Sequence, residues 1–98
     1  MVRQEEIAAA KVAEVAIAML AASAASRQAT IRTLRTANRI ATLAMATGFS
    51  DGKPLVDARH NAGIALSELI HELEKRFPPQ EKIDKAKQAV EDWIEALR

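Results

Sequence analysis

Glu68 and His71 are the side chains of this sequence whose types and spacing come nearest to a metal site. They stand three residues apart in "LSELIHELEKRF", so a helix would place them on one face. In di-iron helical bundles, two helices each give a Glu-x-x-His pair and two others each give one Glu. Glu14 is the only acid in its alanine-rich stretch, so two copies of this chain would supply that ligand set.

A simpler interpretation accounts for the same residues. Glu68 and His71 flank an apolar stripe and have several charged neighbours, as solvated side chains do. Glu14 could pair with Lys11 or meet solvent at a helix margin. His60 lies eleven residues before His71, about 16 Å along a helix, which is too far for both to bind one ion. We therefore expect no metal and no other cofactor, and keep the metal-bound bundle as an alternative.

The arginines of the middle segment are the second candidate for chemistry. Residues 15–50 carry four arginines and no acid, whereas residues 51–98 carry eight basic and ten acidic side chains. Three of the arginines follow i, i+3, i+7 spacing and would form one stripe that could bind phosphates. Single-strand binders usually add stacking aromatics, and this segment has none before Phe49. We favour pairing of these arginines with the acidic helices over their binding to nucleic acid. The candidate contacts are Arg27, Arg32, Arg35 and Arg39.

Composition limits the class of protein. The 98 residues predict one domain, and 49% hydrophobic with 28% charged residues excludes a disordered chain. There is no cysteine, catalytic triad or phosphate-binding loop, so we expect no enzyme. The longest uncharged run has only twelve residues, Val15 to Ser26, where a membrane span needs about 20. We expect a soluble, cytoplasmic protein with no membrane partner.

Three helices are expected in an all-α domain spanning residues 1–98. They cover about 4–47, 54–77 and 79–97, with a loop over 48–53. Gly48 suits a helix C-cap, and Pro54 suits the first turn of the next helix. Pro78 and Pro79 end the second helix, so the second and third should form an antiparallel hairpin.

The first helix decides the oligomeric state. If unbroken, its 44 residues would span about 65 Å, far beyond a compact chain of this length. Ser or Thr between Ser23 and Thr30 could begin a new helix, but alanine favours the continuous form, which we slightly prefer. Its first half is apolar nearly all round, so a second copy would cover Ala8 to Ala25. The predicted interface residues are Val12, Val15, Ile17, Met19, Leu20, Ala22 and Ala24.

The predicted function is a non-enzymatic helical module for protein–protein interaction. It would act as a homo-oligomer, most simply a dimer, and present helical surfaces to a protein partner that the sequence does not identify. Nucleic-acid binding through the arginine stripe and metal binding between subunits are the two alternatives.

Overall fold

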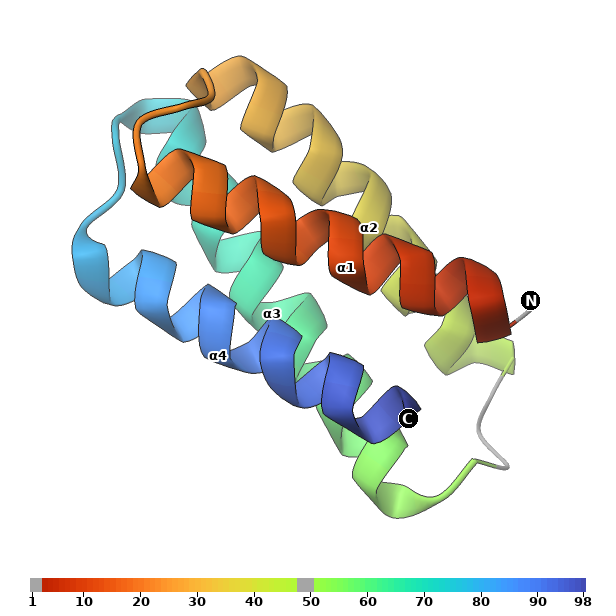
Figure 1. Cartoon of the computed structure of the whole chain (residues 1–98). Helices are drawn as coiled ribbons and strands as arrows, with labels where there is room; N and C mark the ends of the chain where they lie inside the picture. The colour runs from red at the N-terminus through yellow and green to blue at the C-terminus, as the bar shows by residue number, and fades with distance from the viewer. Residues whose placement is uncertain (1–2, 48–50) are drawn as a thin grey trace.

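Four α-helices make up the part of the chain that the computed structural model describes, residues 3–47 and 51–98. They are α1 (Arg3–Ala21), α2 (Arg27–Thr47), α3 (Lys53–Lys75) and α4 (Gln80–Leu97) (Figure 1). The all-α prediction is confirmed. The prediction of three helices is wrong, because the long first helix is divided into α1 and α2.

A tight turn at residues 22–26 divides the predicted long helix. Ser23 adopts a left-handed conformation (φ 57°). Its N–H donates to the carbonyl of Leu20, and the N–H of Ala24 donates to that of Met19, which is the Schellman pattern of a helix end. Ser26 then caps α2, because its Oγ accepts a hydrogen bond from the N–H of Ala29 at 3.1 Å. The alternative break point was therefore the correct one.

The other helix boundaries follow the proline and glycine signals. Gly52 is the N-cap of α3, and Pro54 lies in its first turn as predicted. Pro79 is the N-cap of α4, and the antiparallel hairpin of α3 and α4 is present. The predicted loop at 48–53 and the Gly48 C-cap fall partly or wholly on residues 48–50, which lie outside the described residues.

The helices run up and down around a common core. Each packs against its two neighbours in chain order, and α4 closes the ring against α1, so that α1 and α3 are diagonal in the described part of the chain. Figure 1 shows both chain termini at one end of this bundle. The bundle measures 38 × 21 × 20 Å, with a radius of gyration of 12.6 Å. Folding α2 back along α1 therefore replaces the protruding helix by a compact form.

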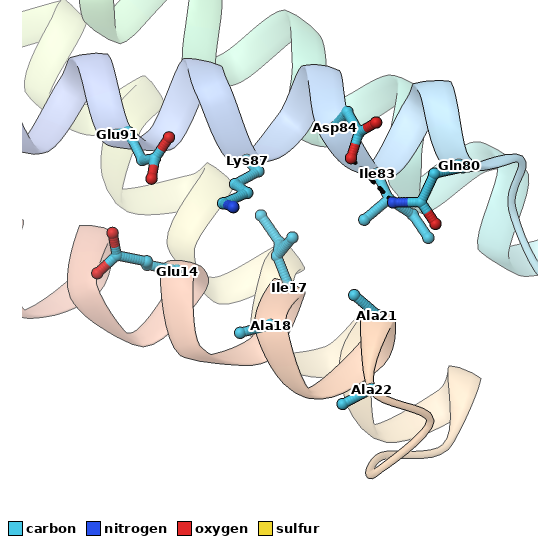
Figure 2. Close-up of a pocket in the computed structure, with 10 residues that line it drawn as sticks. All are labelled: Glu14, Ile17, Ala18, Ala21, Ala22, Gln80, Ile83, Asp84, Lys87 and Glu91. Carbon is cyan, nitrogen blue, oxygen red and sulfur yellow. Dashed lines mark hydrogen bonds between the residues drawn. The ribbon is translucent and has the colours of Figure 1, made fainter.

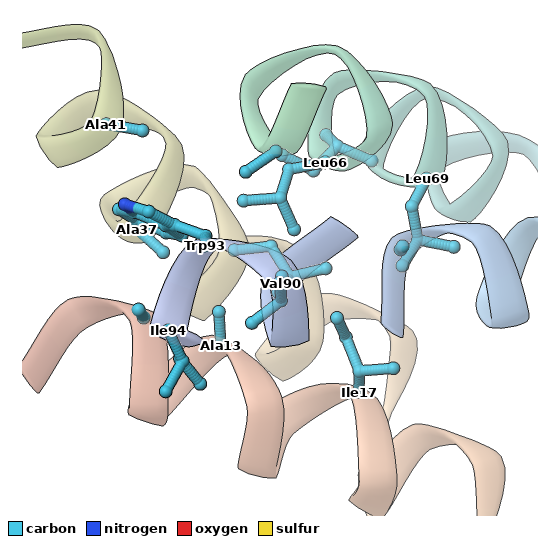
Figure 3. Packing of buried hydrophobic residues seen from close by; sticks show 14 of the residues in the cluster. Ala13, Ile17, Ala37, Ala41, Leu66, Leu69, Val90, Trp93 and Ile94 are labelled. Atoms are coloured by element: carbon cyan, nitrogen blue, oxygen red, sulfur yellow. The ribbon is translucent and has the colours of Figure 1, made fainter. Parts of the chain in front are cut away.

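Alanine makes this bundle narrow. Ala13, Ala37 and Ala41 are fully or almost fully buried in one core cluster with the larger Leu66 and Trp93 (Figure 3). Small side chains let the backbones approach closely, and the large ones fill the remaining space. One apolar face of α4, with its residues at helical spacing, lies entirely in the core. It consists of Ile83, Ala86, Val90, Trp93, Ile94 and Leu97.

Candidate functional site

A buried ion pair joins α1 to α3 across the diagonal of the bundle. Glu6 and Arg59 are only 2% and 3% exposed. The guanidinium of Arg59 donates to both carboxylate oxygens of Glu6, from Nε at 2.7 Å and from Nη2 at 2.8 Å. Trp93 Nε1 of α4 donates to Glu6 Oε2 at 2.8 Å, and Arg59 Nη1 donates to Asp51 at 2.7 Å. Three helices and Asp51, two residues before α3, thus meet at one carboxylate and one guanidinium.

Electrostatics hold this pair in its charged form. Burial by itself would raise the pKa of Glu6, but hydrogen bonds from Arg59 and Trp93, with the charge of Arg59, lower it below its ordinary value. The hydrogen bond with Glu6 is the main cause that raises the pKa of Arg59. Because both carboxylate oxygens of Glu6 accept hydrogen bonds within the chain, we assign the pair a structural role.

The exposed face of α1 carries large apolar side chains. Val12, Val15 and Met19 are 53%, 56% and 42% exposed, and their i, i+3, i+7 spacing places them on one stripe. A hollow of about 370 Å³ lies beside them, bounded across the helix–helix junction by Thr33 of α2. Lys11 is the one charged residue among the described residues that line it. We name Val12, Val15 and Met19 the outer stripe.

A second depression lies between α1 and α4. Its volume is about 430 Å³, and Figure 2 shows the side chains that line it. Ile17 and Ile83 are buried beneath it, and the exposed Ala18, Ala21 and Ala22 leave it open on the α1 side. Polar side chains also line it; they are the neutral Gln80 and the charged Glu14, Asp84, Lys87 and Glu91. We name this depression the α1/α4 groove.

The four arginines of α2 do not act as one cluster. Arg27 donates to the carbonyl of Leu73 at 2.9 Å, and Arg35 forms an ion pair of 2.8 Å with Glu74. Both contacts are to α3, but only that of Arg35 is a pairing with an acidic side chain of the kind that the sequence favoured.

The other two arginines point outward. Arg32 and Arg39 are exposed and make no ion pair with the described residues. Two of the four arginines thus contact their own chain, and the other two are exposed to solvent.

The proposed metal ligands are not brought together within one chain. Glu14 lies at the α1/α4 groove, whereas Glu68 and His71 lie on α3, the helix diagonal to α1. Glu68 contacts Lys85 at 3.0 Å and Lys82 at 3.6 Å, and the hydrogen bond from Lys85 is the main cause that lowers its pKa. Within residues 3–47 and 51–98, no group of three or more His, Asp or Glu side chains could hold a metal ion.

The predicted interface residues divide between the core and the surface. Ile17 and Leu20 are 1% and 0% exposed and lie in the core of their own chain. Val12, Val15 and Met19 form the outer stripe, and Ala22 and Ala24 are exposed in the turn after α1. Five of the seven residues therefore remain accessible to a partner.

The chain matches no known family model, and no curated protein or solved structure resembles it at a significant level. Among the helices of the described residues, none combines the length and the apolar character that a bilayer crossing requires.

The buried ion pair of Glu6 and Arg59 was not predicted from the sequence, although its signal is visible there. Glu6 precedes Ala10, Ala13 and Ile17 at helical spacing and so occupies a core position of α1. Arg59 occupies the corresponding position before Ala62 in α3. Two opposite charges at core positions of different helices, in a chain with one Trp, are the pattern that predicts such a pair.

Proposed function

We propose that this chain is a non-enzymatic interaction module that pairs with a second copy through the outer stripe. The observation that carries the proposal is the exposure of Val12, Val15 and Met19 in a bundle whose other α1 stripe is fully covered. Three large apolar side chains in a row on one helix favour burial against another surface. The earlier reason for self-association, an uncovered long helix, no longer applies, because α2 covers it.

A second copy suits this face better than a charged partner does. Lys11 is the one charged group that the described residues contribute to the hollow, so little polar surface would have to be desolvated. Ala8 and Ala16 flank the stripe and would allow close approach of two helices.

An antiparallel two-fold arrangement fits the spacing. With the axis near Val15 and Ala16, Val12 lies opposite Met19 of the partner subunit, and each copy buries the same patch. The two Lys11 residues would then stand nine positions apart, about 13 Å, whereas a parallel pair would place them side by side. The antiparallel form is therefore the one we propose.

The test is the molecular mass of the protein in solution. Wild-type protein should be dimeric or larger in sedimentation equilibrium at high micromolar concentration, and Val15→Glu should associate clearly more weakly over the same range. The control is Ile64→Glu, because Ile64 is 43% exposed on α3 and lies outside the stripe. A monomeric wild type, or a Val15→Glu variant that associates as the wild type does, contradicts the proposal.

A further inference from the structure

The α1/α4 groove holds negative charge that the chain itself does not neutralise. Glu14 and Glu91 are half-buried, and Asp84 is exposed; none of the three lies within 4 Å of a cationic group of the described residues. Asp84 accepts a hydrogen bond only from the neutral Gln80, at 2.9 Å (Figure 2). Among the described residues that line the groove, Lys87 is the single cation, against the three carboxylates of Glu14, Asp84 and Glu91. An apolar floor with unpaired carboxylates above it fits an amphipathic basic segment.

The same chain carries such a segment on the outward face of α2. Arg32 and Arg39 are exposed without ion pairs among the described residues, and Leu43, four residues after Arg39, is 50% exposed. Their i, i+7, i+11 spacing places all three on one line along the helix. We name Arg32, Arg39 and Leu43 the α2 ridge.

The spacing of the ridge matches that of the groove. Along α4, Asp84 follows Gln80 by four residues and Glu91 follows it by eleven. Along α2, read in the opposite direction, Arg39 and Arg32 lie four and eleven residues from Leu43. Both lines are therefore about 16 Å long, with charges at corresponding positions.

We propose that the α2 ridge of a second copy lies in the α1/α4 groove, antiparallel to α4. Arg39 of the partner subunit then pairs with Asp84, and Arg32 of the partner subunit pairs with Glu91. Leu43 of the partner subunit covers the alanine floor near Ala21 and Ala22. Lys87 faces the uncharged Thr36 of the partner subunit in this register, so no like charges meet.

This contact differs in symmetry from the outer-stripe dimer. Its two sides are different surfaces of the chain, and they lie on the diagonal helices α2 and α4, so one copy can use both at once. A heterologous contact of this kind adds subunits head to tail instead of closing at two. The inference rests on the proposed self-association, and it supplies the step from dimer to larger assembly.

A charge-swap experiment tests the contact in a Val15→Glu background, where the outer stripe cannot contribute. The groove variant is Asp84→Arg/Glu91→Arg, and the ridge variant is Arg32→Glu/Arg39→Glu. Each alone sets like charges against each other, so its association constant should fall about tenfold or more below that of the background protein. An equimolar mixture restores opposite charges at both contacts and should regain association, which weakens as salt is added.

The control is Asp92→Arg/Glu95→Arg, which changes the net charge of α4 equally but lies outside the groove lining. It should associate as the background protein does. The inference is overturned if either swapped variant still associates alone, if the mixture does not, or if nuclease treatment abolishes association, since the arginines would then be bridged by nucleic acid. A failed mixture with an intact Val15-dependent dimer refutes this contact only, and the reverse result refutes only the outer-stripe dimer.

Discussion

Replacing Glu6 by Gln should destabilise the bundle more than any surface substitution. The change keeps the side-chain shape and an acceptor for Trp93 but removes the charge that faces the Arg59 guanidinium, whose Nε and Nη2 lie 2.7 and 2.8 Å from the two Glu6 oxygens. Breaking a buried ion pair from one side costs about 3–5 kcal/mol. Asp51 continues to bind Nη1 of Arg59, so we expect the lower end, about 3 kcal/mol.

Urea unfolding followed by circular dichroism and by the fluorescence of the single Trp measures this loss directly. Out of a total of about 5–15 kcal/mol, a loss of 3 kcal/mol is large, and it should lower Tm by about 12–24 °C in a domain of this size. Glu5→Gln is the matched control, because Glu5 is the exposed neighbour on the same turn, and it should change stability by less than about 0.5 kcal/mol.

A double-mutant cycle separates the pair from its surroundings. Arg59→Gln alone leaves the Glu6 carboxylate buried with only the Trp93 N–H, so it should also cost about 3 kcal/mol or more. The double variant should lose less than the sum of the two single variants by about 1–3 kcal/mol. A Glu6→Gln variant within 1 kcal/mol of wild type, or additive single variants, would refute the account of Glu6 and Arg59 as a coupled buried pair.

Three further outcomes follow from the same structure. The lowered pKa of Glu6 means that its contribution is complete above the ordinary Glu pKa of about 4.3 and is lost as pH falls through the lower folded value, so urea titrations from pH 6 to 2 should show wild type losing its advantage over Glu6→Gln. Ser23→Gly should raise the free energy of unfolding by up to about 1 kcal/mol, and Tm with it, because Ser23 has a left-handed backbone conformation that glycine adopts without strain. An unchanged Tm argues against strain at Ser23. Gly63→Ala should also stabilise by up to about 1 kcal/mol in thermal unfolding, since an added Cβ would meet Asn38 Oδ1 at 3.6 Å, an ordinary contact, and a lower Tm would contradict this.

The sequence predicted helical content and most boundaries because those depend on local signals. Prolines and glycines defined the ends of α3 and α4, and the apolar spacing of α4 identified its buried face correctly. The break after α1 was harder to predict, because the alanines from Ala22 to Ala25 favour a continuous helix. That preference amounts to only a few tenths of a kcal/mol per residue. Packing of an amphipathic face contributes more than such propensity, and turning at Ser23 lets α2 cover α1.

The surfaces could be predicted only in part, because helical spacing shows which residues share a face but not which face turns inward. Helical spacing puts Val12, Val15 and Met19 on one stripe and Ala10, Ala13 and Ile17 on another. The structure buries the second and exposes the first. Depressions such as the α1/α4 groove depend on two helices at once, so the spacing within either helix does not reveal them.

The buried ion pair offers a physical reason for that choice between stripes. Glu6 lies on the same side of α1 as Ala10 and Ala13, so a rotation of α1 that turned the outer stripe inward would withdraw Glu6 from Arg59 and Trp93. Arg59 would keep Asp51 but lose a carboxylate that accepts two of its hydrogen bonds, and Glu6 would lose all three of its donors. The rotation would bury Val12, Val15 and Met19, but it would expose Ile17, Leu20 and several alanines in exchange. The free energy lost with the ion pair exceeds the small net gain from that exchange. We infer that Glu6 and Arg59 determine which face of α1 stays exposed. Replacing both by Met should then relax this preference, seen as broadened methyl resonances of Val12 and Val15, whereas sharp and unshifted resonances would refute the link.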